Sequence, residues 1–359
     1  MLNPRKNGRF FEDFQMGETL IHATPRTVTE GDAALYIALT GARQVLHCAQ
    51  PVAHAMGFRQ QTIDDLLGFH IAFGKTVPDI SVNAVANLGY AEVKFVHPVY
   101  PGDTLHTHST VIGLKENANH KTGIVYVRSI AQNQNQQTVY SWVRWVMVRK
   151  RDEAAPAPMS KIPELDTVVG ADDLPIFHNL DARHFDTQVT GSDQLWEDYS
   201  VGAVIHHPSG MTIEDSDHML ATRLYQNNAR LHFDALMMQD THFGKRLMYG
   251  GHVISICRAL SYDGLENALS IAAINSGTHC NPTFGGDTLY CQHHVLDKWA
   301  LHGRTDLGAL RLRMLGIKNL PSEALESVMV EQAGQTVRHP HIVLDLDYTV
   351  LMPRRSITR

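Results

Sequence analysis

An internal repeat constrains the fold of this chain more than any other feature. Residues 10–49 align without a gap on residues 195–234 of the 359-residue sequence. Equivalent residues are 185 positions apart, and they include the pairs Phe11 and Trp196, Gly17 and Gly202, Asp32 and Asp217, and His47 and His232. Self-similarity of this kind indicates that one structural unit occurs twice in the chain.

A second match and a linker define the domain organisation. Residues 93–105 match residues 277–289 at an offset of 184, in the same order as the first match. Between the repeats, residues 152–166 are rich in Ala and Pro and lack hydrophobic periodicity, which is typical of an extended linker. We therefore predict an N-terminal domain over residues 1–152, a linker over 153–175 and a C-terminal domain over 176–359.

Each half combines one long helix pattern with several strand patterns. Helical periodicity covers residues 64–77 in the first half and begins at Gly250 in the second. Alternating, β-branched segments follow at residues 123–134, 138–150 and 342–355. One helix followed by antiparallel strands predicts a curved sheet wrapped around that helix, in an α+β fold.

The composition is that of a globular protein without a nucleic-acid or membrane partner. With 43% hydrophobic and 19% charged residues, the chain can bury a full core. Its formal charge of −6, and the lack of a long Lys and Arg block, argue against binding to a phosphate backbone. The sequence contains no apolar stretch of signal-peptide or membrane-span length. We therefore expect a cytoplasmic protein.

Neither cysteine nor histidine spacing indicates a metal or disulfide site. The four cysteines lie too far apart for a CxxC motif, so we expect reduced thiols. Histidine occurs 22 times, which makes a metal site worth testing. Two groups lie close in sequence but lack a recognised ligand spacing, namely His106 with His108, and His279 with Cys280, Cys291, His293 and His294. We expect no metal and no separate cofactor.

One motif carries a resemblance to a known family. The segments TRLYQNNARLHFDA (222–235) and MYGGHVIS (248–255) are similar to the hydratase signature of the MaoC-like dehydratases. In that signature, a polar acid/base pair lies five residues apart and a glycine opens the hot-dog helix. Longer segments resemble the mesaconyl-CoA hydratases within this family, including ALYIALTG (34–41), RWVMVRKRD (144–152), NALSIAAINSG (267–277), GRTDLGALR (303–311) and DYTVLMPRR (347–355).

The resemblance implies both a fold and an activity. The fold is a tandem double hot-dog, with CoA bound between the two halves. The activity is the reversible hydration of a short enoyl-CoA thioester, here mesaconyl-CoA to β-methylmalyl-CoA. Two other readings stay open, a thioesterase on the same fold and a non-catalytic acyl-CoA-binding module. Because one chain supplies both hot-dogs, a monomer can be complete, although a homo-oligomer is also compatible with the sequence.

The motif residues fit the chemistry of hydration. His232 can act as the general base because its unperturbed pKa lies near neutrality. Gly250 stands 18 residues later at the expected helix start, where its free N–H can polarise the thioester oxygen. Asn227 replaces the aspartate of the signature and cannot transfer a proton, so we expect it to orient water. Carboxylates that could supply an acid instead are Asp234, Glu214, Asp64 and Asp65.

Further residues are predicted to contact the substrate. Arg230 replaces the proline of the signature, and its guanidinium could bind the free carboxylate of a mesaconyl group. A surface salt bridge is the alternative for Arg230. Gly251 and Asp234 complete the predicted binding residues. His47 keeps the repeat position in the first half, but without an equivalent glycine we expect a packed histidine. Candidates for contacts to the CoA phosphates are Arg149, Lys150, Arg354 and Arg355.

Overall fold

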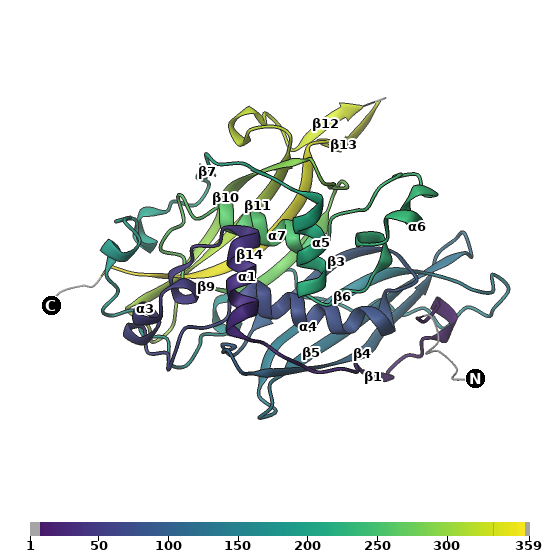
Figure 1. Ribbon diagram of the computed structural model, residues 1–359, viewed down its shortest axis with the longest axis horizontal. Coiled ribbons are helices and arrows are strands. Elements are labelled where there is room, and N and C mark those ends of the chain that lie inside the picture. The colour runs from purple at the N-terminus through teal and green to yellow at the C-terminus, as the bar shows by residue number, and fades with distance from the viewer. Residues whose placement is uncertain (1–7, 333, 356–359) are drawn as a thin grey trace.

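The computed structural model describes residues 8–332 and 334–355 and contains one large antiparallel sheet (Figure 1). The sheet has twelve strands, and its main path runs in the order β1-β4-β5-β6-β3-β9-β14-β11-β10-β7. Strands of the first half fill one end of this path, and strands of the second half fill the other. Each end wraps around the long helix of its own half, α4 or α7, as the hot-dog prediction requires.

The two halves contain equivalent elements in the same order. The first half comprises β1 (Thr19–Ile21), β2 (Arg26–Thr27), α1 (Glu30–Thr40), α2 (Val45–Cys48), α3 (Gln50–Ala55), α4 (Asp65–Ile80), β3 (Ala84–Phe95), β4 (Thr104–Glu116), β5 (Thr122–Gln132) and β6 (Thr138–Arg149). The second comprises β7 (Val204–His206), β8 (Met211–Thr212), α5 (Asp215–Leu224), α6 (Ala235–Gln239), α7 (Gly250–Leu260), β9 (Ser270–His279), β10 (Thr288–Ala300), β11 (Leu307–Lys318), β12 (Met329–Gln332), β13 (Gln335–Arg338) and β14 (Ile342–Pro353).

The offset of 185 residues found in the sequence holds for the structure. Helices α1 and α5 begin at Glu30 and Asp215, and helices α4 and α7 begin at Asp65 and Gly250. The β12–β13 hairpin interrupts the correspondence, since it has no equivalent between β5 and β6. In Figure 1 this hairpin projects from the second half. The tandem repeat and the double hot-dog fold are therefore confirmed.

Strands β3 and β9 join the two halves edge to edge. They pair antiparallel, with Tyr90 opposite Gly277 and Lys94 opposite Ala273. Helices α4 and α7 also touch, because the Nε2 atom of His70 lies 3.1 Å from the hydroxyl of Ser255. The largest hydrophobic cluster contains residues of both halves. The two halves therefore share one hydrophobic core, although the sequence analysis treated them as separate domains.

Residues 153–175 connect the halves with little regular structure. Lys161 forms an isolated bridge to Leu114, and residues Ala171–Asp173 form one 3-10 turn. Val169 and Leu174 are buried in a cluster that also contains residues of both halves. The predicted domain limits themselves stay a prediction. Among the residues described, none of the helices has the length and apolarity that a membrane span needs.

We predict that the contact of α4 with the second half tolerates no added methyl group. A Cβ atom at Gly74 would lie 2.1 Å from the carbonyl oxygen of Tyr225, which is backbone and cannot move alone. Gly74→Ala should therefore lower the free energy of unfolding in urea by about 1–3 kcal/mol. Gly31→Ala is the control, since Thr29 Oγ1 at 3.6 Å is its nearest neighbour. Equal stabilities of the two variants would refute the predicted clash.

Candidate active site

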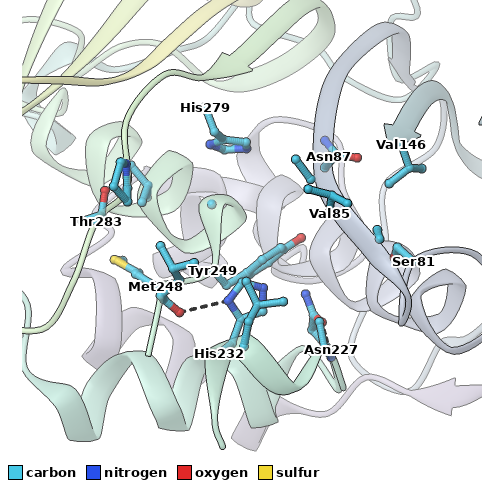
Figure 2. Close-up of a pocket in the computed structure, with 18 of the residues that line it drawn as sticks. Ser81, Val85, Asn87, Val146, Asn227, His232, Met248, Tyr249, His279 and Thr283 are labelled. Carbon is cyan, nitrogen blue, oxygen red and sulfur yellow. Dashed lines mark hydrogen bonds between the residues drawn. The ribbon is translucent and has the colours of Figure 1, made fainter. Parts of the chain in front are cut away.

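A cavity of about 330 Å³ lies between the two halves, close to the N-terminus of α7 (Figure 2). This volume is in the range of roughly 300–1,000 Å³ that small-molecule sites occupy. Helix α4 and strands β3 and β6 of the first half form one part of its wall. The second half contributes the start of α7, the end of β9 and the residues around the 3-10 turn Arg230–His232. Neither half alone encloses this cavity.

His232 lines the cavity in a fixed tautomer. Its Nδ1 atom lies 3.0 Å from the carbonyl oxygen of Leu247, which is the dashed contact in Figure 2. A carbonyl oxygen only accepts hydrogen bonds, so Nδ1 carries the proton and Nε2 has a free lone pair. Burial lowers the pKa of His232 to about 4. The imidazole is therefore neutral at physiological pH and is available as a base.

Asn227 lies beside His232 and turns its amide nitrogen to the cavity. The residue is 5% exposed, and its Oδ1 atom accepts a hydrogen bond of 3.1 Å from the backbone N–H of Ala229. Because the oxygen is used in this turn, the NH₂ group is the part that remains for a ligand (Figure 2). Asn227 can therefore donate a hydrogen bond to a water molecule in the cavity.

Gly250 begins helix α7 with its N–H group unused by the helix. The first helical bonds run from the N–H groups of His252 and Val253 to the carbonyl of Tyr249, which lies before Gly250. The N–H of Gly250 is thus one of the free donors at a positive helix end. A Cβ atom here would lie 2.4 Å from the ring of His279, so this close approach requires glycine.

His279 is the cavity residue that the sequence analysis missed as a candidate for catalysis. It ends β9, and its Nε2 atom lies 3.2 Å from the hydroxyl of Tyr90 in the first half. Burial and, second, the proximity of His232 lower the pKa of His279 to about 4. The repeat offered a signal, because the equivalent position in the first half is Phe95, a buried core residue. A histidine replaces that core aromatic only in the half that carries His232.

The three predicted catalytic residues His232, Asn227 and Gly250 thus line one cavity, and the predicted binding residues do not. Arg230 is exposed on the 3-10 turn, and Asp234 caps α6 by accepting a hydrogen bond from Met237 N at 3.0 Å. Gly251 is buried where a Cβ atom would meet Tyr249 and His70, so it permits close packing. Their predicted contacts with substrate are not supported by these positions.

No Asp or Glu lines the cavity within the described part of the chain. Glu214 is exposed at the start of α5. Asp64 caps α4 by accepting from Leu66 N, and Asp65 accepts from Ile271 N at 2.8 Å. The carboxylates that the sequence analysis offered as possible acids therefore have other partners, whereas His232 and His279 both line the cavity.

Comparisons with known proteins identify the family of this chain. A family model described as mesaconyl-CoA hydratase matches residues 2–319. The chain belongs to the mesaconyl-CoA hydratase family. It is 53% identical to the β-methylmalyl-CoA dehydratase of Chloroflexus aurantiacus and 51% identical to the mesaconyl-CoA hydratase of Cereibacter sphaeroides. Each of these alignments covers 97% of this chain and 98% of the relative.

Solved structures place the mesaconyl-CoA hydratase family among double hot-dog proteins. A putative MaoC domain protein dehydratase from Chloroflexus aurantiacus superposes with a TM-score of 0.94 at 52% identity, covering 99% of this chain and 100% of that one. A conserved protein of Mycobacterium tuberculosis, described as having a double hot-dog fold, superposes with a TM-score of 0.75 at 24% identity, covering 98% and 100%. The second likeness concerns the fold alone.

In this chain, the first half has a packed cluster of side chains at the place where the second half has its cavity. His47 stands at the position of His232, and its Nδ1 atom lies 2.8 Å from the Thr62 hydroxyl. Asp65 occupies the position of Gly250 and lies 3.7 Å from Nε2 of His47. Burial alone would lower the pKa of His47, but Asp65 and Asp64 raise it overall. The structure agrees with the prediction of a packed histidine at position 47.

Three of the four basic residues predicted for CoA phosphates are engaged within the protein. Lys150 is 8% exposed and donates to Glu116 at 2.7 Å. Arg354 and Arg355 pair with Glu197 and Asp198. Arg149 is exposed at the end of β6, next to the β3 segment that lines the cavity. Of the four, Arg149 is the one without an ion pair or side-chain hydrogen bond within the described part of the chain.

One buried group has the residue types of a metal site. The ligand atoms of His207, Cys291 and His293 lie within 4.8 Å of one another. However, His207 Nε2 hydrogen-bonds His293 Nδ1 at 2.8 Å, and the remaining ring nitrogens bond the Asp263 carbonyl and the Tyr348 hydroxyl. Every imidazole nitrogen of the group therefore has a partner within the protein, which leaves no free lone pair to bind an ion.

We predict that His232 titrates far below an ordinary histidine. Its ring resonances in NMR spectra, assigned by their loss in His232→Gln, should titrate near pH 4, where an unperturbed imidazole titrates at about 6.5. Since the unfolded chain takes up the proton at higher pH than the native state, this residue should also lower stability as the pH falls below about 6.5. A midpoint near 6.5 would show that the ring is open to water.

Proposed function

We propose that this chain catalyses the reversible hydration of mesaconyl-CoA to β-methylmalyl-CoA, as a hydro-lyase. Family membership and the names of two relatives with more than 50% identity support this reaction. The cavity between the halves supports it independently. The observation that carries the proposal is that a neutral imidazole, an amide donor and a free helix N–H line the same cavity.

The proposed forward reaction begins with a water molecule held between Asn227 and His232. The NH₂ group of Asn227 donates to the water oxygen, and Nε2 of His232 accepts one water proton. The oxygen bonds to the β-carbon of the thioester, and the π electrons of the double bond move onto the thioester oxygen. The N–H of Gly250 stabilises this enolate, a contribution of about 3 kcal/mol for such a donor.

In the second step of the reaction, the α-carbon receives a proton. The enolate collapses and its α-carbon takes the proton from the imidazolium of His232, which restores the neutral base. Burial makes this imidazolium unstable in the free enzyme, as its lowered pKa indicates. The negative charge on the bound enolate compensates, so the proton is held only while the intermediate exists. The reverse sequence dehydrates β-methylmalyl-CoA.

The substrate itself supplies CoA, and no separate cofactor takes part in the proposed steps. We propose that the CoA moiety leaves the cavity past β3 and that Arg149 contacts one of its phosphates. The exposure of Arg149 supports this assignment, as does its backbone N–H, which donates to the carbonyl oxygen of Asn83, the residue before the cavity-lining Ala84. The N-terminal half would then serve as a binding wall, and the C-terminal half would supply the reacting groups.

We predict that water adds to one face of the double bond. If His232 handles both protons, the hydroxyl and the α-hydrogen arrive from the same side. Hydration of mesaconyl-CoA in H₂O should give the diastereomer of syn addition, which the vicinal coupling constant between the α- and β-hydrogens in the NMR spectrum of the product identifies. Anti addition would instead assign the α-carbon proton to a second group, for which His279 beside Gly250 is the candidate.

We predict that His232→Ala lowers kcat for mesaconyl-CoA by about 100- to 10,000-fold, because general acid/base catalysis is lost. Loss of enoyl absorbance in the ultraviolet measures the reaction. Asn227→Ala should lower kcat by a smaller factor, since water can still reach the base. His120→Ala, at an exposed turn residue, is the matched control.

A thiol reagent in the same assay separates the proposal from its rivals. Release of free CoA without formation of β-methylmalyl-CoA would indicate a thioesterase. Tight binding of the thioester with constant absorbance would indicate a binding module. Either result with the wild-type protein would overturn the proposed reaction.

A further inference from the structure

We infer that Arg144 binds the free carboxylate of a dicarboxylic acyl-CoA and thereby selects this class of substrate. The inference deepens the proposed function and rests on it. Arg144 belongs to β6 of the first half, is 1% exposed and lines the same cavity as His232. It contributes the guanidinium on the cavity wall, whereas Arg230, the residue that the sequence analysis proposed for the carboxylate, is exposed to solvent.

Arg144 is a buried cation without an acidic partner among the described residues. Its NH2 atom donates to Thr76 Oγ1 at 2.7 Å and more weakly to Ser81 Oγ at 3.5 Å. Its guanidinium lies 4.3 Å from the ring centroid of Phe73. Its Nε atom is buried and has no acceptor. Buried charges in proteins are normally paired, so the partner of this one is expected to come from outside the chain.

The positive charge persists at neutral pH. Burial lowers the pKa of Arg144, but only to about 10. The hydroxyl groups of Thr76 and Ser81 accept hydrogen bonds without neutralising the charge. A carboxylate that enters the cavity would therefore meet a protonated guanidinium, with which it can form charge-assisted hydrogen bonds away from water.

Asn87 adds a second polar group without a partner. It lies on β3 opposite Val146, which is two residues from Arg144 on the same face of β6. Both its Nδ2 and its Oδ1 atom are buried without a hydrogen-bond partner, and the residue lines the cavity. Much of the neighbouring wall is apolar, including Val77 and Val146. Three buried polar atoms without partners thus gather on one side of the cavity, which fits a polar ligand group.

The position of the carboxylate in the substrate gives this contact a mechanistic effect. In mesaconyl-CoA the free carboxylate is bonded to the β-carbon, which is the atom that water attacks. The rings of Phe73 and Tyr249 lie between Arg144 and His232. Phe73 packs against the guanidinium of Arg144 and against the ring of Tyr249, and the ring centroids of Tyr249 and His232 are 5.5 Å apart. Binding the carboxylate would orient the β-carbon toward the water and offset the negative charge near the developing enolate.

The test compares mesaconyl-CoA with 2-methylcrotonyl-CoA, in which a methyl group replaces the carboxylate. We expect wild type to prefer mesaconyl-CoA in kcat/KM. Arg144→Met should reduce this preference by about 100-fold, because a buried charge pair is lost. Arg144→Lys keeps the charge without the planar fork and should reduce it less. Arg128→Met is the matched control, since Arg128 lies on neighbouring β5, is half-exposed and pairs with Glu92 at 2.6 Å.

Further variants keep the test decisive if Arg144→Met does not fold. Asn87→Leu and Arg144→Lys then report the preference, and either must reduce it. Arg230→Met tests the other candidate and should leave the preference at the wild-type value. Equal losses on both substrates in the Arg144 variants, or a reduced preference in Arg230→Met alone, would overturn the inference.

A binding measurement separates this inference from the proposed reaction. Methylsuccinyl-CoA and 2-methylbutyryl-CoA lack the double bond and cannot be hydrated, so their affinities report binding alone. Only methylsuccinyl-CoA carries a carboxylate. We expect wild type to bind methylsuccinyl-CoA on the order of 100-fold more tightly, Arg144→Met to lose most of that difference, and Arg144→Lys to lose a smaller part of it. A wild-type protein that is inert as a hydratase but shows this preference would refute the reaction alone. Equal affinities would refute the role of Arg144.

Discussion

The pairing of β3 with β9 is the contact on which the rest of the structure depends. Through it, two hot-dog units form one continuous sheet, and their helices α4 and α7 come to lie side by side. The cavity exists only because of this arrangement, since its walls come from α4, β3 and β6 on one side and from α7 and β9 on the other. A base from the second half can thereby face a cation from the first.

The N-termini of α4 and α7 show how the two copies of the duplicated fold have diverged. At the start of α4, Asp64 caps the helix and Asp65 approaches His47, so polar groups in this half satisfy one another. At the start of α7, Tyr249 provides no side-chain cap and Gly250 leaves its N–H free. The same local fold therefore yields a packed interior in one half and an open donor in the other.

The sequence predicted the fold well because the repeat and the periodicity are local or regular patterns. It also predicted that His232, Asn227 and Gly250 belong together, since all three lie within 24 residues of one another. Their roles remain predictions. Arg144 and His279 were not predicted to line the cavity, because they reach it through sheet pairing between distant segments. In the sequence, Arg144 looks like any polar residue of an alternating strand. Only the structure shows that it is buried without an acidic partner.

Duplication within a single chain has a consequence for substrates whose two ends differ. By strand register, the position on β14 that corresponds to Arg144 is Tyr348, which bonds to His293 in a packed cluster. In a symmetric assembly of identical halves, an arginine at this position would appear twice in identical surroundings, so a difference such as Arg144 in one half and Tyr348 in the other could not arise. Fusion of the halves allows each to change separately. One cavity can then be polarised for an asymmetric molecule, with a thioester at one end and an acid at the other.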